Sequence, residues 1–342
     1  MKPTARSPFR SAFTLIELLV VIAIIALLVG ILLPSLASAR KEARAVQAAS
    51  NARQIAIGVN TYTADSKGYI PPSYVYAAEA NSSRWVVADQ RDQGAGFSPQ
   101  FGYVHWSWFL FENGGAPEGA FESPNAWNGG APPTNPGPNG TPEAGQTFDP
   151  AIEDKQVKRV GFGGNAALFP RNKFASDSSG GRLNRLVTTA GVDNSTKGAS
   201  KTILVAEFIS TINHIALREP GGLMKSHRPI TPFVGSGGND IYSEPDSGTV
   251  ARFSYPGENE IVPLDQLNQE GVLTGQSGLS ILNAVGRHHP GGENKLNGGT
   301  GNFAFVDAHV ERTTVRETIR QRLWGDKFFS LTGRNINVQT GP

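Results

Sequence analysis

Four residues near the C-terminus have side chains that commonly bind transition metals. His288 and His289 are adjacent, and Asp307 and His309 follow after an interval of 18 residues between His288 and Asp307. Asp307 and His309 lie on one face if a strand continues through them, but not if the chain turns between them. No His-Glu-x-x-His pattern supports a zinc enzyme. The pattern therefore favours a hydrogen-bonded structural cluster, with metal binding as the alternative.

A second group of oxygen ligands lies in the Gly-rich stretch "GGNDIYSEPDSG". Its carboxylates are Asp240, Glu244 and Asp246. Carboxylates on a flexible loop suit calcium, but the stretch lacks the spacing of an EF-hand loop. A solvated acidic loop is the favoured interpretation, and a calcium site is the alternative.

Other catalytic patterns are missing from the sequence. The chain has no cysteine, which excludes thiolate ligands and cysteine nucleophiles. No serine stands in a Gly-x-Ser-x-Gly context, and "GFGGN" at 161–165 lacks the Lys-Ser/Thr of a phosphate loop. Four tryptophans could stack on sugars, although most tryptophans in a domain of this size anchor the core or loops; they are Trp85, Trp106, Trp108 and Trp127. We expect no catalytic residue and no enzyme activity.

Glu17 raises a different question, because it is a carboxylate within an apolar run. Phe13 to Leu33 is 21 residues long, and a helix of that length spans roughly 31 Å, about the thickness of a hydrocarbon core. A charge there costs on the order of 3 kcal/mol. The preceding basic residues predict a cytoplasmic N-terminus and an outer location for the rest; they are Lys2, Arg6 and Arg10.

The stretch "FTLIELLVVIAIIALL" resembles the N-terminus of type IV pilins and type II secretion pseudopilins. The resemblance implies that prepilin peptidase cuts a basic leader between Ala12 and Phe13 and that the new N-terminus is methylated. Ala12 departs from the family's usual Gly. The resemblance also implies that Glu17 pairs with the N-terminal amine of a neighbouring subunit and sets the axial register of a filament. The alternative is a Glu17 that only reaches the membrane interface.

This resemblance implies an assembly function: a subunit of a type II secretion or type IV pilus-like filament. The expected location is the inner membrane, with one span and a periplasmic or extracellular domain. The implied partners are the peptidase and methyltransferase, other pilin-like subunits, the secretion or pilus machinery, and membrane lipid. Loss of the three basic leader residues changes the formal net charge from +2 to −1, so no nucleic-acid partner is expected. The rival function is a membrane-anchored extracytoplasmic protein that binds a ligand such as a carbohydrate and does not polymerise.

The expected fold is α+β, with a long N-terminal hydrophobic helix and an antiparallel β-rich domain with long Gly/Pro loops. Apolar residues at helical spacing, among them Val46 and Ile57 with Ile55 and Val59 beside them, extend the helix beyond the membrane. Gly30 and Pro34 predict a kink or a locally melted turn. The expected parts are a leader (1–12), a transmembrane helix (13–33), its exposed continuation (34–64) and an outer domain (65–342), which includes a loop-rich insertion (112–146) and a C-terminal hairpin with a short helix (284–342).

Within the outer domain, β-branched and aromatic runs predict strands. They lie at 106–111, 201–208, 248–255 and 302–306, and an amphipathic helix is expected within 315–324.

Several segments also resemble a group of pilin-like proteins abundant in Planctomycetes. "RHHPGGENKLNGGTGNFAFVDAHVE" resembles that group's C-terminal signature, in which nine residues separate a His from Asp-Gly. His288 and Asp307 match it if 293–301 is an insertion, and Ala308 replaces the Gly, directly before His309. A two-residue Asp-Ala hairpin turn would need positive φ at both positions, which is unfavourable for Ala, so a longer or different turn is the alternative.

Overall fold

The computed structural model describes a large part of the chain in two compact units, Met1–Ala43 and Arg44–Pro342. The described residues are 14–76, 92–93, 102–143, 146, 149–169, 174–175, 182–183, 187–209, 230, 232–235, 253–261, 263–264, 282, 284–294, 298–328 and 336–337.

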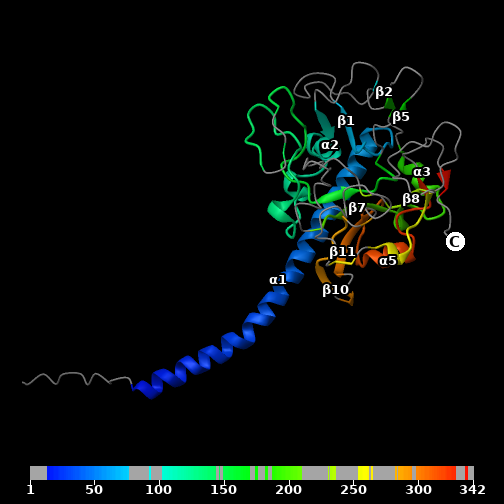
Figure 1. Ribbon diagram of the computed structural model, residues 1–342. Helices are drawn as coiled ribbons and strands as arrows, with labels where there is room; N and C mark the ends of the chain where they lie inside the picture. Colours follow the sequence, from blue (N-terminus) through cyan, green and yellow to red (C-terminus); the bar gives the residue numbers. More distant parts are fainter. Residues whose placement is uncertain are drawn as a thin grey trace, which may run out of the picture. The chain divides into compact units, whose positions relative to one another are not determined.

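The first element is one long helix, α1 (Leu15–Asp65), which is labelled in Figure 1. Every side chain from Thr14 to Lys41 is exposed, including all described residues of the apolar run. The helix passes through Gly30 and Pro34 without interruption, so the melted turn is not present. A bend of the helix axis at these residues stays a prediction.

The C-terminal part of α1 buries a face made mostly of small residues. Ala45, Ala48 and Ala52 are buried, and Ile55 and Val59 continue the same face. Val46 and Ile57, which the spacing placed on the apolar stripe, are 67% and 47% exposed. The predicted stripe is therefore not the buried face, because helical spacing alone does not decide which of several apolar stripes packs against the rest of the unit.

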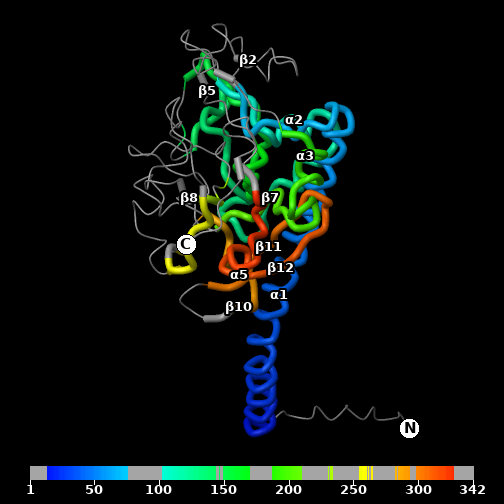
Figure 2. Tube along the Cα trace, turned by 90° about the vertical axis from the view of Figure 1, so that its right-hand side faces the viewer, coloured from blue at the N-terminus to red at the C-terminus, as the bar shows by residue number. Residues whose placement is uncertain are grey.

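A five-stranded antiparallel sheet forms the centre of the second unit. Four strands follow the order β10–β11–β7–β4, and β12 also pairs with β11; their bounds are β4 (Phe162–Gly164), β7 (Ile203–Glu207), β10 (His289–Asn294), β11 (Gly298–Phe305) and β12 (Val310–Thr313). Figure 2 shows β7, β11 and β12 side by side. All five residues of β7 are buried. The predicted α+β class with an antiparallel sheet is confirmed.

The predicted strands at 201–208 and 302–306 correspond to β7 and β11, but 106–111 is wrong. That segment is the helix α2 (Trp106–Glu112), which follows β3 (Tyr103–His105). The Nδ1 atom of His105 accepts a hydrogen bond from the N–H of Ser107 and caps the helix. Trp106, Phe109 and Leu110 are buried at helical spacing. A run of aromatic and aliphatic residues with a single serine is compatible with either period, and the cap selects the helix.

The turn between β11 and β12 is longer than two residues. The N–H of Phe305 donates to the carbonyl of His309, and the N–H of Ala308 donates to the carbonyl of Phe305. Ala308 has a φ of +68°, whereas Asp307 does not have positive φ. The two-residue alternative is therefore wrong, and the longer turn is correct. A Gly at 308 would adopt this conformation without strain.

Of the residues interpreted as an insertion (293–301), those that the structure describes belong to β10 and β11, in which Asn294 pairs with Gly298. The described residues of 112–146 contain two short 3-10 helices, η4 (Glu118–Phe121) and η5 (Trp127–Gly129). Among these described residues, the β-structure is limited to an isolated bridge at Ala131. The short helix near the C-terminus is α5 (Val315–Arg320). The remaining described elements are β1 (Tyr74–Tyr76), β2 (Asp92–Gln93), β5 (Phe174–Ala175), β6 (Arg182–Leu183), α3 (Thr189–Asp193), η6 (Ala199–Lys201), β8 (Val234–Gly235), β9 (Phe253–Ser254), η7 (Glu258–Glu260), β13 (Lys327–Phe328) and β14 (Ile336–Asn337).

Candidate functional site

Glu207 is a carboxylate at the centre of the sheet. It is the last residue of β7 and pairs with Phe162 of β4, and its side chain is completely buried. A buried charge is stable only when polar groups or ions compensate it. The groups around Glu207 therefore define the candidate site.

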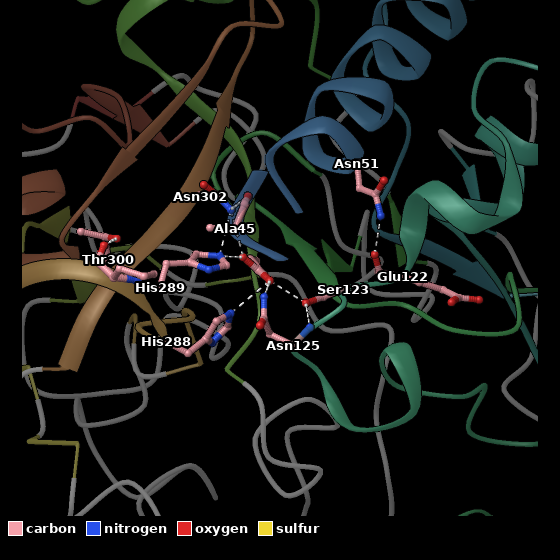
Figure 3. A network of polar contacts seen from close by, with 11 residues as sticks. Ala45, Asn51, Glu122, Ser123, Asn125, His288, His289, Thr300 and Asn302 are labelled. Atoms are coloured by element: carbon pink, nitrogen blue, oxygen red, sulfur yellow. Dashed lines mark hydrogen bonds and ion pairs between the residues drawn. The ribbon is translucent and has the colours of Figure 1, made fainter. Parts of the chain in front are cut away.

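The Oε1 atom of Glu207 faces the loop-rich segment and His288. The hydroxyl of Ser123 donates to Oε1 at 2.5 Å, and the amide of Asn125 lies 3.4 Å from the same atom. The Nε2 atom of His288 lies 3.1 Å from Oε1, but it makes no hydrogen bond of good geometry although it is buried. Figure 3 shows these side chains pointing toward one centre.

The Oε2 atom of Glu207 faces the hairpin. The Nε2 atom of His289 lies 2.6 Å from Oε2, and the Nδ2 atom of Asn302 lies 3.4 Å from it. Asn302 also donates from Nδ2 to the carbonyl of Ala45 in α1 at 3.0 Å. Asn302 Nδ2 is 2.9 Å from His289 Nε2. The cluster thus joins α1, β7, β10, β11 and the loop that carries Ser123 (Figure 3).

The electrostatics keep Glu207 ionised. Burial alone raises the pKa of Glu207, but the contacts with His288 and His289 outweigh it and hold the pKa at about 2. A carboxylate next to two imidazoles can share protons with them through hydrogen bonds, or the three groups together can bind a cation. Ser123 bonds to the carboxylate rather than to an imidazole, so its hydroxyl lacks the adjacent base that a serine nucleophile needs.

The four residues expected to converge form two separate groups. His288 and His289 meet at Glu207. Asp307 and His309 pair with each other at 2.5 Å on the β11–β12 turn, and both are partly exposed. The His309 ring stacks on Phe305, with ring centroids 4.2 Å apart. The expected convergence of all four is wrong because the chain turns between Phe305 and Val310.

Other predicted site residues lie apart from this cluster or outside the described residues. Asp240, Glu244 and Asp246 lie outside them, as do Ala12, Phe13 and Trp85. Trp106 is buried in the core, whereas Trp127 is 39% exposed, with the Arg159 guanidinium over its ring at 5.8 Å. Trp106 is thus a core residue, and Trp127 lies in the loop-rich segment 112–146. Sugar binding by the tryptophans stays a prediction.

Glu17 begins the long helix with a reciprocal cap. Its Oε2 atom accepts from the N–H and the hydroxyl of Thr14, both at 2.8 Å, and the N–H of Glu17 donates to the hydroxyl of Thr14 at 3.2 Å. This is a Thr-x-x-Glu capping box, which satisfies otherwise unpaired N–H groups. Glu17 therefore has a role within its own helix, independent of a neighbour.

Glu207, Ser123 and Asn302 were not singled out as site residues from the sequence. One signal was available for Glu207: it ends the apolar run "ILVAE" of a strand buried throughout. A charged residue in such a strand needs a partner, but the partners of Glu207 lie more than 80 residues away along the chain, so the sequence does not name them.

Comparison with known proteins supports the N-terminal resemblance. Residues 9–33 match the model of the prokaryotic N-terminal methylation motif. Searches of curated proteins and of solved structures give no match. Among the described residues, α1 is long and apolar enough to cross a membrane, which together with the motif is consistent with a single-pass membrane anchor. The motif at the N-terminus thus supports a type IV pilin-like protein.

Proposed function

We propose that the chain is a subunit of a type II secretion or type IV pilus-like filament. One observation carries the proposal: nothing among the described residues covers the apolar surface of α1 from Thr14 to Lys41. An uncovered apolar surface of this length requires lipid or other apolar helices around it. The methylation motif at residues 9–33 favours a helix that uses both, first lipid and then copies of the pilin-like helix.

The proposal includes processing and orientation. Prepilin peptidase removes residues 1–12 on the cytoplasmic side, the Phe13 amine is methylated, and the second unit lies outside the inner membrane. The basic residues Lys2, Arg6 and Arg10 support this orientation. Ala12 is small enough to occupy the position where the resembled family has Gly.

The first prediction concerns this processing. Intact-mass analysis of protein extracted from membranes should show a chain that lacks residues 1–12 and carries a methyl group on Phe13. Ala12→Leu should leave the leader attached, because a bulky side chain does not fit where the peptidase accepts small residues. A mature chain that begins at Met1, or after Ala39 of the small-residue stretch "ASA" (Ala37 to Ala39) that a secretory signal peptidase could cut, contradicts the proposal.

The role of Glu17 in assembly follows from its charge. In a filament, its carboxylate would pair with the amine of a neighbouring Phe13, and loss of one partner of a buried ion pair costs about 3–5 kcal/mol. The structure offers a way to separate this role from the capping role. Gln at the same position of a capping box also reaches back to the N-terminus of the helix, so Glu17→Gln removes the charge and largely keeps the cap.

The second prediction compares Glu17→Gln with Thr14→Ala. Crosslinking in membranes should show a ladder of oligomers for the wild type, and Glu17→Gln should insert at normal levels but lose the ladder. Thr14→Ala removes the hydroxyl from the cap, keeps the charge, and should retain the ladder. A ladder unchanged in Glu17→Gln would mean that Glu17 serves the cap alone.

A membrane-anchored binding protein that does not polymerise is the second candidate. The 39% exposed Trp127 favours it, since an exposed aromatic face can stack on a sugar; Arg159 lies over the same ring and pairs with Glu143, so it is not a free cation for a ligand. The crosslinking experiment separates the two, because an anchored binder gives no ladder in the wild type.

A further inference from the structure

The carboxylate of Glu207 is surrounded by more donors than it can accept. Five polar groups lie within 3.5 Å of its two oxygens, and a carboxylate offers about four lone-pair directions. These groups are the hydroxyl of Ser123, the amides of Asn125 and Asn302, and the Nε2 atoms of His288 and His289. The buried Nε2 of His288 is the group left without a hydrogen bond.

His289 has a second conflict at the same place. Its Nε2 atom lies between the carboxylate of Glu207 at 2.6 Å and the amide nitrogen of Asn302 at 2.9 Å. The bond from Asn302 Nδ2 to the carbonyl of Ala45 fixes the orientation of that amide. Nε2 can donate to the carboxylate or accept from the amide, but one nitrogen cannot do both.

A cation resolves both conflicts. If the two Nε2 atoms direct their lone pairs to a metal, they no longer compete for hydrogen bonds to the carboxylate oxygens. The metal then takes one carboxylate site, and Ser123, Asn125 and Asn302 take the others. His289 also no longer needs a proton between itself and Glu207.

We propose that Glu207, His288 and His289 form a binding site for a divalent cation of the zinc class. The donor set decides the class: two imidazole nitrogens and one carboxylate suit zinc and its neighbours, whereas calcium and magnesium take oxygen ligands. Three protein ligands leave the fourth position of a tetrahedral site for water.

The distances fit this coordination. The three ligand atoms lie within 4.8 Å of one another, and tetrahedral zinc keeps such atoms about 3.3 Å apart. Because one carboxylate oxygen binds the ion, one of the two measured contacts is a ligand-ligand distance: the 3.1 Å between His288 Nε2 and Oε1 already matches, whereas the 2.6 Å between His289 Nε2 and Oε2 would have to widen. The hydroxyl of Ser123 holds the carboxylate from behind, as outer partners of metal ligands do.

The burial of the three ligands indicates how an ion would enter the site and what it would do there. The side chain of His288 is 16% exposed, whereas those of His289 and Glu207 are 1% and 0% exposed. His288 therefore faces the solvent side of the site and gives the ion its route. Because β7 and the start of β10 would share one ion, its role is to hold the sheet together.

The test uses the full-length protein in detergent, without a histidine tag. The protein is stripped with a chelator, dialysed against zinc, and analysed for metal by mass spectrometry, with calcium as a separate probe. We expect one bound zinc per chain in the wild type and in His309→Gln, which changes an exposed histidine, and loss of this zinc in His288→Gln. Ser123→Ala should weaken binding roughly 10–100-fold.

Two further measurements do not depend on the folding of a variant. Zinc should raise the Tm of the wild type, because a ligand of the folded state stabilises it. X-ray absorption at the zinc edge should show two histidine ligands in the wild type. A wild type without bound zinc, an absorption spectrum without histidine ligands, or equal zinc in His288→Gln would overturn the proposal.

Discussion

His105 is a buried imidazole that caps a helix. It is 1% exposed, and its Nδ1 atom contacts the N–H of Ser107 at 3.3 Å and its hydroxyl at 2.8 Å. Burial lowers the pKa of His105 to about 3, from an ordinary value near 6.5. Because the folded state binds the proton less tightly than the unfolded state, the stability from neutral His105 is fully present above pH 6.5 and is lost as the pH falls toward 3.

The third prediction follows from this difference. His105→Asn keeps a side-chain oxygen as the helix cap and does not titrate. Each pH unit below 6.5 should cost the wild type up to about 1.4 kcal/mol that the variant does not lose. The Tm values of the two proteins, measured from about pH 7.5 to about pH 4, roughly the window set by the two pKa values of His105, should therefore converge as the pH falls. Parallel curves would mean that His105 does not carry the proton linkage.

At Gly58, α1 packs tightly against the loop after α2. A Cβ atom at Gly58 would lie 2.9 Å from both the Cβ of Ala116 and the carbonyl oxygen of Gly115. These contacts include backbone, so a larger side chain cannot be accommodated by rotation alone. The short distance between α1 and the loop after α2 therefore requires a glycine at position 58.

The fourth prediction uses two glycines of the same helix. Gly58→Leu should destabilise the second unit by about 1–3 kcal/mol, the usual cost of overpacking. Gly30→Leu is the matched control, since nothing lies within 4 Å of a Cβ there and the gain in helix propensity is the same. Thermal unfolding of both variants in detergent gives the comparison. Equal Tm values would show that the loop at 115–116 moves to make room.

The elements were predictable where one pattern dominates. The short apolar runs that form β7 and β11 predict only strands, and the long apolar run at the N-terminus predicts only a helix. The segment 106–111 has no single interpretation, because the choice of α2 depends on the contact between His105 and Ser107. The buried face of α1 could not be chosen from the sequence, because Ala45 and Val46 belong to neighbouring stripes with the same helical spacing.

At the scale of the whole molecule, the exposed apolar helix determines behaviour in water. All described side chains of the helix before Glu42 are exposed, and the second compact unit begins at Arg44. The core lies in the second unit, beginning at Ala45. The membrane-like segment and the core therefore occupy different parts of the chain.

The fifth prediction is that a chain starting at Ser35 stays soluble without detergent. It lacks the apolar run but retains every buried residue of α1. Size-exclusion chromatography should give one folded species, and circular dichroism should show a cooperative transition. Aggregation equal to that of the full chain would place the boundary of the independent unit elsewhere.

The candidate site could not be predicted from the sequence as a unit. The adjacent histidines stood out in the sequence. Glu207 and Asn302 lie next to them because of the strand order of the sheet, and Ser123 reaches Glu207 from a loop. β11 pairs with β7 on one side, and the hairpin returns His289 to Glu207. Such positions depend on pairing across about 80 to 100 residues, which local patterns do not specify.

The position of β7 in the sheet also sets the order in which the chain folds. β7 lies between β4, which ends at Gly164, and β11, which begins at Gly298. During synthesis, the "ILVAE" strand has one edge without its partner until about 100 further residues have been made. The amide of Asn165 also donates to the carbonyl of Trp324, which emerges later still. Distant pairing slows folding, and an unpaired apolar edge invites other strands, so nascent chains that stop before β11 should be held by chaperones or aggregate.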